Sequence, residues 1–264
     1  LVLFSCTGLF AQSNLINPQP EMEQNGQALG MLLSGASLTS SPSANTLGGF
    51  RHYSIGGWGA YVKPNFSAGD LNAGCLTAVL RGGLFRGFNI GPGVHGLGST
   101  DVFLRFGTLF SNGKHSDSGG FYSVGARMGI LRNSILTPAL SISASYNKSS
   151  DFNLGESIYG TPAGTGRADI EVWAVRIDIS KNFFFLTPSA GFGLNKTRIH
   201  SEGGNSSFDS DGNAIFNPAG YTASKPRMIF YGGLEWNVLI LRMNLEIGHV
   251  ADETFGSLGI RLTI

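Results

Sequence analysis

The chain has 264 residues, of which 39 are glycine and only 13% are charged, and its formal net charge is +1. Charged residues make up about a quarter of an ordinary soluble domain. The net charge argues neither for nor against binding to nucleic acid, and no basic tract or nucleic-acid motif supports such binding. No run of eighteen apolar residues is present, so the sequence offers no transmembrane helix. A closed β-barrel is then the way for such a chain to cross a bilayer.

The first part of the chain precedes the predicted strands. Residues 1–11 are similar to the end of a secretory signal peptide, with an apolar run and the small Ala11 before a polar stretch. Cys6 lies in a weak lipobox-like context, which leaves its lipidation open. Residues 12–47, with a short helix expected over 20–33, have two open interpretations. They form either a periplasmic lead-in or a plug that folds into the barrel lumen.

From residue 48 onward, the sequence predicts one strand after another. We expect strands at 49–63, 75–81, 88–95, 102–110, 121–131, 136–148, 168–179, 186–196, 228–238, 239–248 and 257–264. Eleven strands are recognisable, and single-chain bacterial barrels usually have an even number. We therefore expect an all-β fold consisting of a single transmembrane antiparallel β-barrel over 48–264, with about twelve strands and ten as the alternative.

Two of these strands, at 136–148 and 186–196, carry the same pattern, and both begin with Leu-Thr-Pro. Apolar residues alternate in both with Ser, Thr, Gly or Asn. Side chains alternate between the two faces of a strand, so one face is hydrocarbon and the other is small and uncharged. A soluble β-sandwich also alternates, but its outer face carries Lys and Glu. The pattern favours a barrel wall with lipid outside and a hydrated lumen inside.

The connections between the predicted strands alternate in length. Tight turns are expected at 181–182 and 238–239, and long polar loops at 148–167 and 201–226. This asymmetry is typical of outer-membrane barrels, so we expect the long loops to face outside the cell. A two-residue turn at 238–239 would place Glu235 directly opposite Arg242 on the lumen face.

Several features of the sequence resemble a known class of protein. The run Phe50-Arg51-His52-Tyr53-Ser54-Ile55-Gly56, the paired Leu-Thr-Pro strands and the end of the chain within a strand resemble bacterial outer-membrane β-barrel proteins. More narrowly, they resemble poorly characterised barrel families of Gram-negative bacteria. The resemblance covers 48–264 and implies a location in the cell outer membrane. Outer-membrane lipid is then the expected partner, with other envelope proteins as further candidates. Many such proteins end in Phe or Trp, whereas this chain ends in Ile264.

Nine charged residues are predicted to line the lumen: Arg81, Arg105, Arg127, Arg176, Asp178, Glu235, Arg242, Glu246 and Arg261. Six are arginines and three are acids, a difference of +3. One interpretation is a closed interior held together by salt bridges, as in small barrels. The other is a passage with a mild preference for anions.

Two motifs resemble sites that carry out chemistry or bind a metal. Ser111, in the sequence Ser-Asn-Gly, resembles the nucleophile region of outer-membrane phospholipases, where a His two residues earlier acts as the base. Leu109 holds that position here, so no catalytic residue is predicted. The run Asp209-Ser210-Asp211-Gly212-Asn213 resembles the start of a calcium loop, but Gly220 replaces the Glu expected at the twelfth position. We predict neither a metal nor a cofactor.

The sequence thus favours a barrel that acts as a small channel or transport-type protein with a mildly cationic lumen and no enzymatic activity. The alternative is a structural barrel that conducts nothing and anchors a partner in an envelope complex. A lipid-modifying hydrolase is less favoured, because the base is missing.

Overall fold

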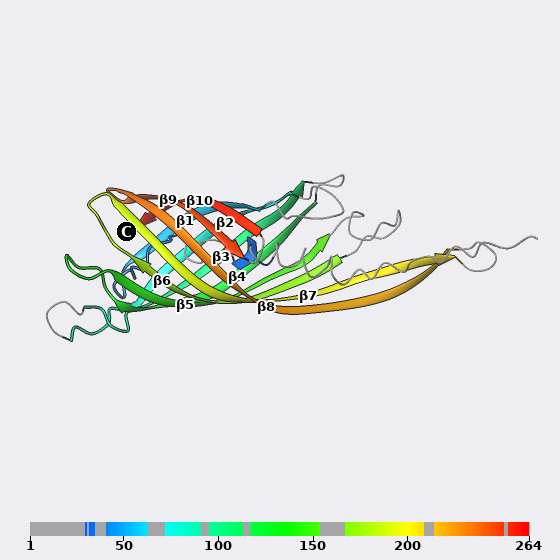
Figure 1. Ribbon diagram of the computed structural model, residues 1–264, viewed down its shortest axis with the longest axis horizontal. Helices are drawn as coiled ribbons and strands as arrows, with labels where there is room; N and C mark the ends of the chain where they lie inside the picture. Colours follow the sequence, from blue (N-terminus) through cyan, green and yellow to red (C-terminus); the bar gives the residue numbers. More distant parts are fainter. Residues whose placement is uncertain are drawn as a thin grey trace, which may run out of the picture.

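The computed structural model describes residues 30, 32–34, 41–62, 72–90, 95–112, 117–153, 167–208, 214–250 and 253–263. These residues form ten strands: β1 (Tyr53–Val62), β2 (Asn72–Phe85), β3 (Thr100–Asn112), β4 (Asp117–Leu131), β5 (Ala139–Asn153), β6 (Arg167–Ser180), β7 (Leu186–Phe208), β8 (Ala214–Val238), β9 (Leu241–Val250) and β10 (Glu253–Thr263). Each strand pairs with its neighbours in sequence, and β1 pairs with β10, which closes an antiparallel barrel (Figure 1). The predicted all-β barrel is confirmed with the alternative count of ten strands, and the count of twelve is wrong.

The extra predicted strand, at 88–95, is part of the connection between β2 and β3. The alternation of Phe88 and Ile90 suggested a strand, but Phe88 makes only an isolated bridge to Leu97. Gly87 and Gly96 have φ angles of 84° and 74°, in the left-handed region that glycine adopts readily and extended strands do not. The backbone therefore turns on both sides of this apolar pair.

The turn between β8 and β9 consists of Leu239 and Ile240, one residue later than predicted, and Leu239 has a φ of 55°. Glu235 pairs with Asn244 and not with Arg242, so the predicted register was wrong by two residues. A shift of two residues leaves every side chain on its own face of the sheet. The inward direction predicted for Glu235 and Arg242 therefore still holds.

The predicted loop at 201–226 is largely a β-ribbon. β7 pairs with β6 as far as Glu202, and β8 pairs with β9 only from Ile229 onward, while β7 and β8 continue to pair with each other up to Phe208 and Ala214. The two strands project beyond the rest of the barrel (Figure 1). Antiparallel pairing uses main-chain groups alone. A Gly/Ser/Asn-rich sequence, which is typical of a loop, can therefore continue the main-chain pairing of β7 and β8 beyond the barrel wall.

The outer face of the wall is apolar. Side chains such as Val124, Phe192, Phe230 and Leu245 are between 40 and 55% exposed, while the residues that alternate with them point inward and are polar or glycine over much of the barrel. No helix among the described residues is long and apolar enough to cross a membrane. Closure satisfies the main-chain groups of the edge strands, and an apolar exterior suits hydrocarbon. The fold is a closed antiparallel β-barrel with an apolar exterior.

Candidate functional site in the barrel lumen

The lumen contains part of the chain's own N-terminal region. Residues 41–47 lie inside the barrel, and Ser41, Ser43 and Ala44 are each 1% exposed. Ser41 Oγ donates to Glu235 Oε2 at 2.6 Å. At the other end of the segment, the Leu47 amide donates to the carboxylate of Asp101. We call residues 41–47 the lumen segment.

Four of the predicted lumen arginines donate to main-chain carbonyl oxygens of this region: Arg81 to Asn45 at 2.8 Å, Arg127 to Ser43 at 2.6 Å, Arg105 to Leu33 at 2.8 Å and Arg176 to Ser34 at 2.9 Å. A guanidinium has five donors in a planar fork, so it can bind a carbonyl and a carboxylate at the same time. Carbonyl oxygens belong to every residue, and these contacts therefore depend on the path of the backbone and not on its side chains.

Further hydroxyl contacts fix the lumen segment to the wall. The Ala44 amide donates to Ser180 Oγ at 2.9 Å, and Ser43 Oγ lies 3.4 Å from the same hydroxyl. Thr46 Oγ1 lies 2.7 Å from Ser99 Oγ. The segment is thus bound to the ends of β3 and β6 as well as to β8.

The carboxylates of the lumen pair with arginines of other strands. Arg81 pairs with Asp101, Arg127 Nη2 lies 3.4 Å from Asp178 Oδ2, and Arg261 Nη2 lies 2.9 Å from Glu235 Oε2. Tyr231 also donates to Asp178, and its ring lies 4.8 Å from the guanidinium carbon of Arg176. A buried charge costs several kcal/mol unless it is paired, so these partners allow the acids to remain inside.

The structure places all nine predicted residues in the interior. Eight of them are at most 3% exposed, and Glu246 lies 4.0 Å from Arg176. Arg242 is the exception, because its side chain is 32% exposed, although its Nη1 still lies 3.4 Å from Glu235 Oε1. Most of these cations therefore have partners within the barrel.

Asp101 is the functional residue that sequence reasoning missed. It precedes the predicted start of the β3 strand by one residue, yet it lies four residues from Arg105 and so shares the inward face. It is fully buried and accepts from both Arg81 and the lumen segment. With Asp101 added to the nine predicted residues, the set has six arginines and four acids, a difference of +2 instead of +3.

The lumen has two halves. The polar half, with Asp101, Asp178 and Glu235, lies toward the short turns and holds the lumen segment. The opposite half, toward the β7–β8 ribbon, is apolar and includes Val62, Leu109, Phe121, Val172, Ile229 and Phe255, each at most 5% exposed. Leu32 and Leu33 of the N-terminal region belong to the same buried cluster. We call this region the apolar half of the lumen.

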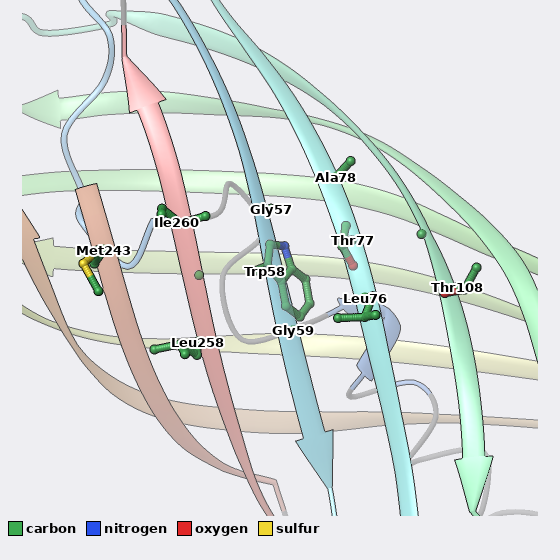
Figure 2. Close-up of a pocket in the computed structure, with 12 residues that line it drawn as sticks. Gly57, Trp58, Gly59, Leu76, Thr77, Ala78, Thr108, Met243, Leu258 and Ile260 are labelled. Carbon is green, nitrogen blue, oxygen red and sulfur yellow. The ribbon is translucent and has the colours of Figure 1, made fainter. Parts of the chain in front are cut away.

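A groove of about 630 Å³ lies on the outer wall across β1, β2, β3, β9 and β10. Figure 2 shows that Leu76, Leu258 and Ile260 surround it, and that Gly57 and Gly59 run along its floor. No charged residue is among those that line it. The groove therefore presents hydrocarbon and small residues and no group for acid–base chemistry.

Other predicted features lie wholly or partly outside the described residues. These are the stretch 1–11 with Cys6, most of 12–40, and the run 209–213. Of the phospholipase-like motif, Leu109 is buried inside the barrel, and nothing is described for the Ser111 side chain. Among the described residues, no group of three or more His, Cys, Asp or Glu could hold a metal ion.

No protein-family model matches the chain, and no curated protein matches it. Solved structures with a similar fold include three barrels of autotransporters. The transport unit of the autotransporter AIDA-I from Escherichia coli has 11% identity and a TM-score of 0.41, covering 91% of this chain and 98% of its own. The translocator domain of the autotransporter NalP from Neisseria meningitidis has 10% identity and a TM-score of 0.46, covering 93% and 96%. The β domain of the Bordetella autotransporter BrkA has 11% identity and a TM-score of 0.42, covering 80% and 99%.

Proposed function

We propose that this protein is a transport-type outer-membrane barrel whose lumen is closed at rest by residues 41–47 and opens when this segment leaves. The observation that carries the proposal is the set of arginine contacts to main-chain carbonyl oxygens. Arg81 and Arg127 bind Asn45 and Ser43 in this way. Outer-membrane lipid is the proposed surrounding of the wall, and the barrel acts without chemistry of its own.

The composition of the lumen segment supports a removable occupant. Its residues are Ser, Pro, Ser, Ala, Asn, Thr and Leu, so it fills the polar half with small side chains and few apolar contacts. The ion pairs Arg81–Asp101 and Arg261–Glu235 are formed between residues of the wall alone. They persist when it leaves, and water can replace the lost carbonyl and hydroxyl contacts at a modest net cost per hydrogen bond.

An open lumen would carry a mild preference for anions. The nine predicted lumen residues together with Asp101 include two more cations than anions, and departure of the segment frees donors of Arg81 and Arg127 from their carbonyl partners. Fixed cations in a narrow low-dielectric passage raise the local concentration of anions. The closed state passes no ions and therefore shows no such preference.

A second candidate function is that of a barrel that conducts nothing and anchors an envelope protein. The exposed surface of the short turns between strands favours this function. Ile135, Phe184 and Leu239 are at least 95% exposed at the tips of three turns. Lys181 Nζ donates to the carbonyl oxygens of Ser134 and Ile135 and so ties two of these turns together. An exposed apolar surface of this kind suits a partner or the lipid interface.

The experiment is a reversible lock on the lumen segment. Ser43 Oγ and Ser180 Oγ are 3.4 Å apart, so the variant Ser43→Cys/Ser180→Cys, with Cys75→Ala to remove the native buried thiol, should form a disulfide. In planar bilayers we expect openings under reducing conditions and none after oxidation. The Ser180→Cys single variant should open under both conditions. Equal openings in the oxidised and reduced double variant would contradict the proposal, and closed barrels in every state would favour the anchoring function.

A further inference from the structure

The apolar half of the lumen is unusual for a membrane barrel. Barrel interiors are polar because they hold water, yet here Leu109, Phe121, Val172 and Phe255 point inward and are at most 5% exposed. What fills the space is a helical turn that includes Leu32 and Leu33, both at most 1% exposed. If that turn leaves, hydrocarbon faces water unless another apolar group takes its place.

Arg105 lies at the boundary between the two halves. Its guanidinium is fully buried, with its carbon atom 5.0 Å from the ring of Trp58 and 5.8 Å from the ring of Phe121. No described carboxylate lies within ion-pair distance of Arg105, and Asp101 and Asp178 pair with Arg81 and Arg127. Its Nε and Nη1 atoms have no hydrogen-bond acceptor among the described residues. A buried cation in this state is suited to receive an anion.

The present occupant shows the chemistry that fits this boundary. Arg105 Nη2 donates to the Leu33 carbonyl at 2.8 Å, and Arg176 Nη2 donates to the Ser34 carbonyl at 2.9 Å. Two apolar side chains thus enter the apolar half, and two adjacent carbonyl oxygens meet two arginines. A hydrocarbon chain that ends in a carboxylate presents the same arrangement, with a full negative charge in addition. A carboxylate can accept from two guanidinium groups, and charge-assisted hydrogen bonds are about twice as strong as neutral ones.

We propose that the lumen binds an amphiphilic carboxylate, a fatty-acid-like molecule, in place of the turn that includes residues 32–34. Its alkyl chain lies in the apolar half, and its carboxylate binds Arg105 and Arg176. This inference rests on the proposed function, because the site becomes free only when the N-terminal region moves. It names the substrate class of the barrel.

The test uses the full chain in lipid nanodiscs and 2-bromododecanoate as the probe. Trp173→Phe and Trp236→Phe leave Trp58 as the remaining tryptophan of three, and bromine beside the carboxylate quenches it on contact. We expect saturable quenching of Trp58 in this background. Arg105→Gln should raise the Kd at least tenfold. Arg198→Gln, which removes an exposed cation from the outer face of β7, should leave the Kd within twofold.

Three controls make the outcome decisive. The methyl ester of the probe enters the bilayer equally but has no charge, so it should not give saturable quenching. Heat-modifiable mobility on gels reports whether each variant has folded, and Arg105→Lys should recover part of the affinity because it restores a cation. Equal quenching by acid and ester would show partition into lipid alone and would overturn the inference. If openings in planar bilayers show that the lumen segment leaves but the acid does not bind, this inference fails while the proposed function stands.

Discussion

Gly233→Val should displace the lumen segment. Gly233 points inward from β8, and a Cβ at this position would lie 2.6 Å from Pro42 Cβ. Ordinary contacts between carbon atoms begin at about 3.5 Å, so Pro42 or the strand must move by about 1 Å. Overpacking of this kind typically costs about 1–3 kcal/mol. That penalty applies only while the segment is in place, so the ratio of open to closed barrels should rise roughly 5- to 150-fold.

The neighbouring glycine provides the matched control. Gly232 faces lipid, and a Cβ there would meet only the Ser189 carbonyl at 3.9 Å, so Gly232→Val adds the same side chain without touching the segment. Single-channel recording in planar bilayers measures the open probability of both variants, and heat-modifiable mobility shows that both are folded. We expect a rise for Gly233→Val alone. An unchanged open probability for Gly233→Val, or an equal rise for Gly232→Val, would refute the reasoning.

Two further predictions concern the wall and its buried charges. Leu245→Arg places a charge on the lipid face near the middle of β9 and should destabilise the folded barrel by about 2–4 kcal/mol, whereas Leu245→Met should cost less than about 1.5 kcal/mol. Urea titrations of folding into vesicles measure the stability of both variants. Equal stability of the two variants would show that this face does not contact lipid. Asp101→Asn leaves the buried Arg81 without its carboxylate and should lower the free energy of unfolding by roughly 3–5 kcal/mol. The urea midpoint of unfolding measures this change. A decrease below about 1 kcal/mol would mean that the ion pair is exposed to solvent.

The sequence predicts which side chains of the wall point to the lumen and which point to lipid, because side chains alternate between the two faces of a strand as a consequence of backbone geometry. Arg105, Arg127 and Arg176 were placed inward on this basis, and the structure buries all three. Alternation does not show where a strand ends, and for this reason the apolar pair Phe88 and Ile90 suggested a strand where the chain forms a loop.

Other features left no signal in the sequence. The turn at Leu239 and Ile240 has neither Gly nor Asn, the residues that usually mark a position with positive φ, so its register could not be located. The sequence also does not show which groups the lumen arginines bind. Arg81 and Arg127 bind carbonyl oxygens, which every residue carries, and only the folded path of the backbone determines which ones they meet.

The central claim, that residues 41–47 occupy the lumen, is tested most directly by cross-linking in native outer membranes. Thr46 Oγ1 and Ser99 Oγ are 2.7 Å apart inside the barrel, whereas Val102, three residues further along the chain, faces lipid and is 38% exposed. In a Cys75→Ala background, Thr46→Cys should form a disulfide with Ser99→Cys in high yield and none with Val102→Cys. A low yield with Ser99→Cys in folded barrels, or an equal yield at both positions, would place the segment outside the lumen.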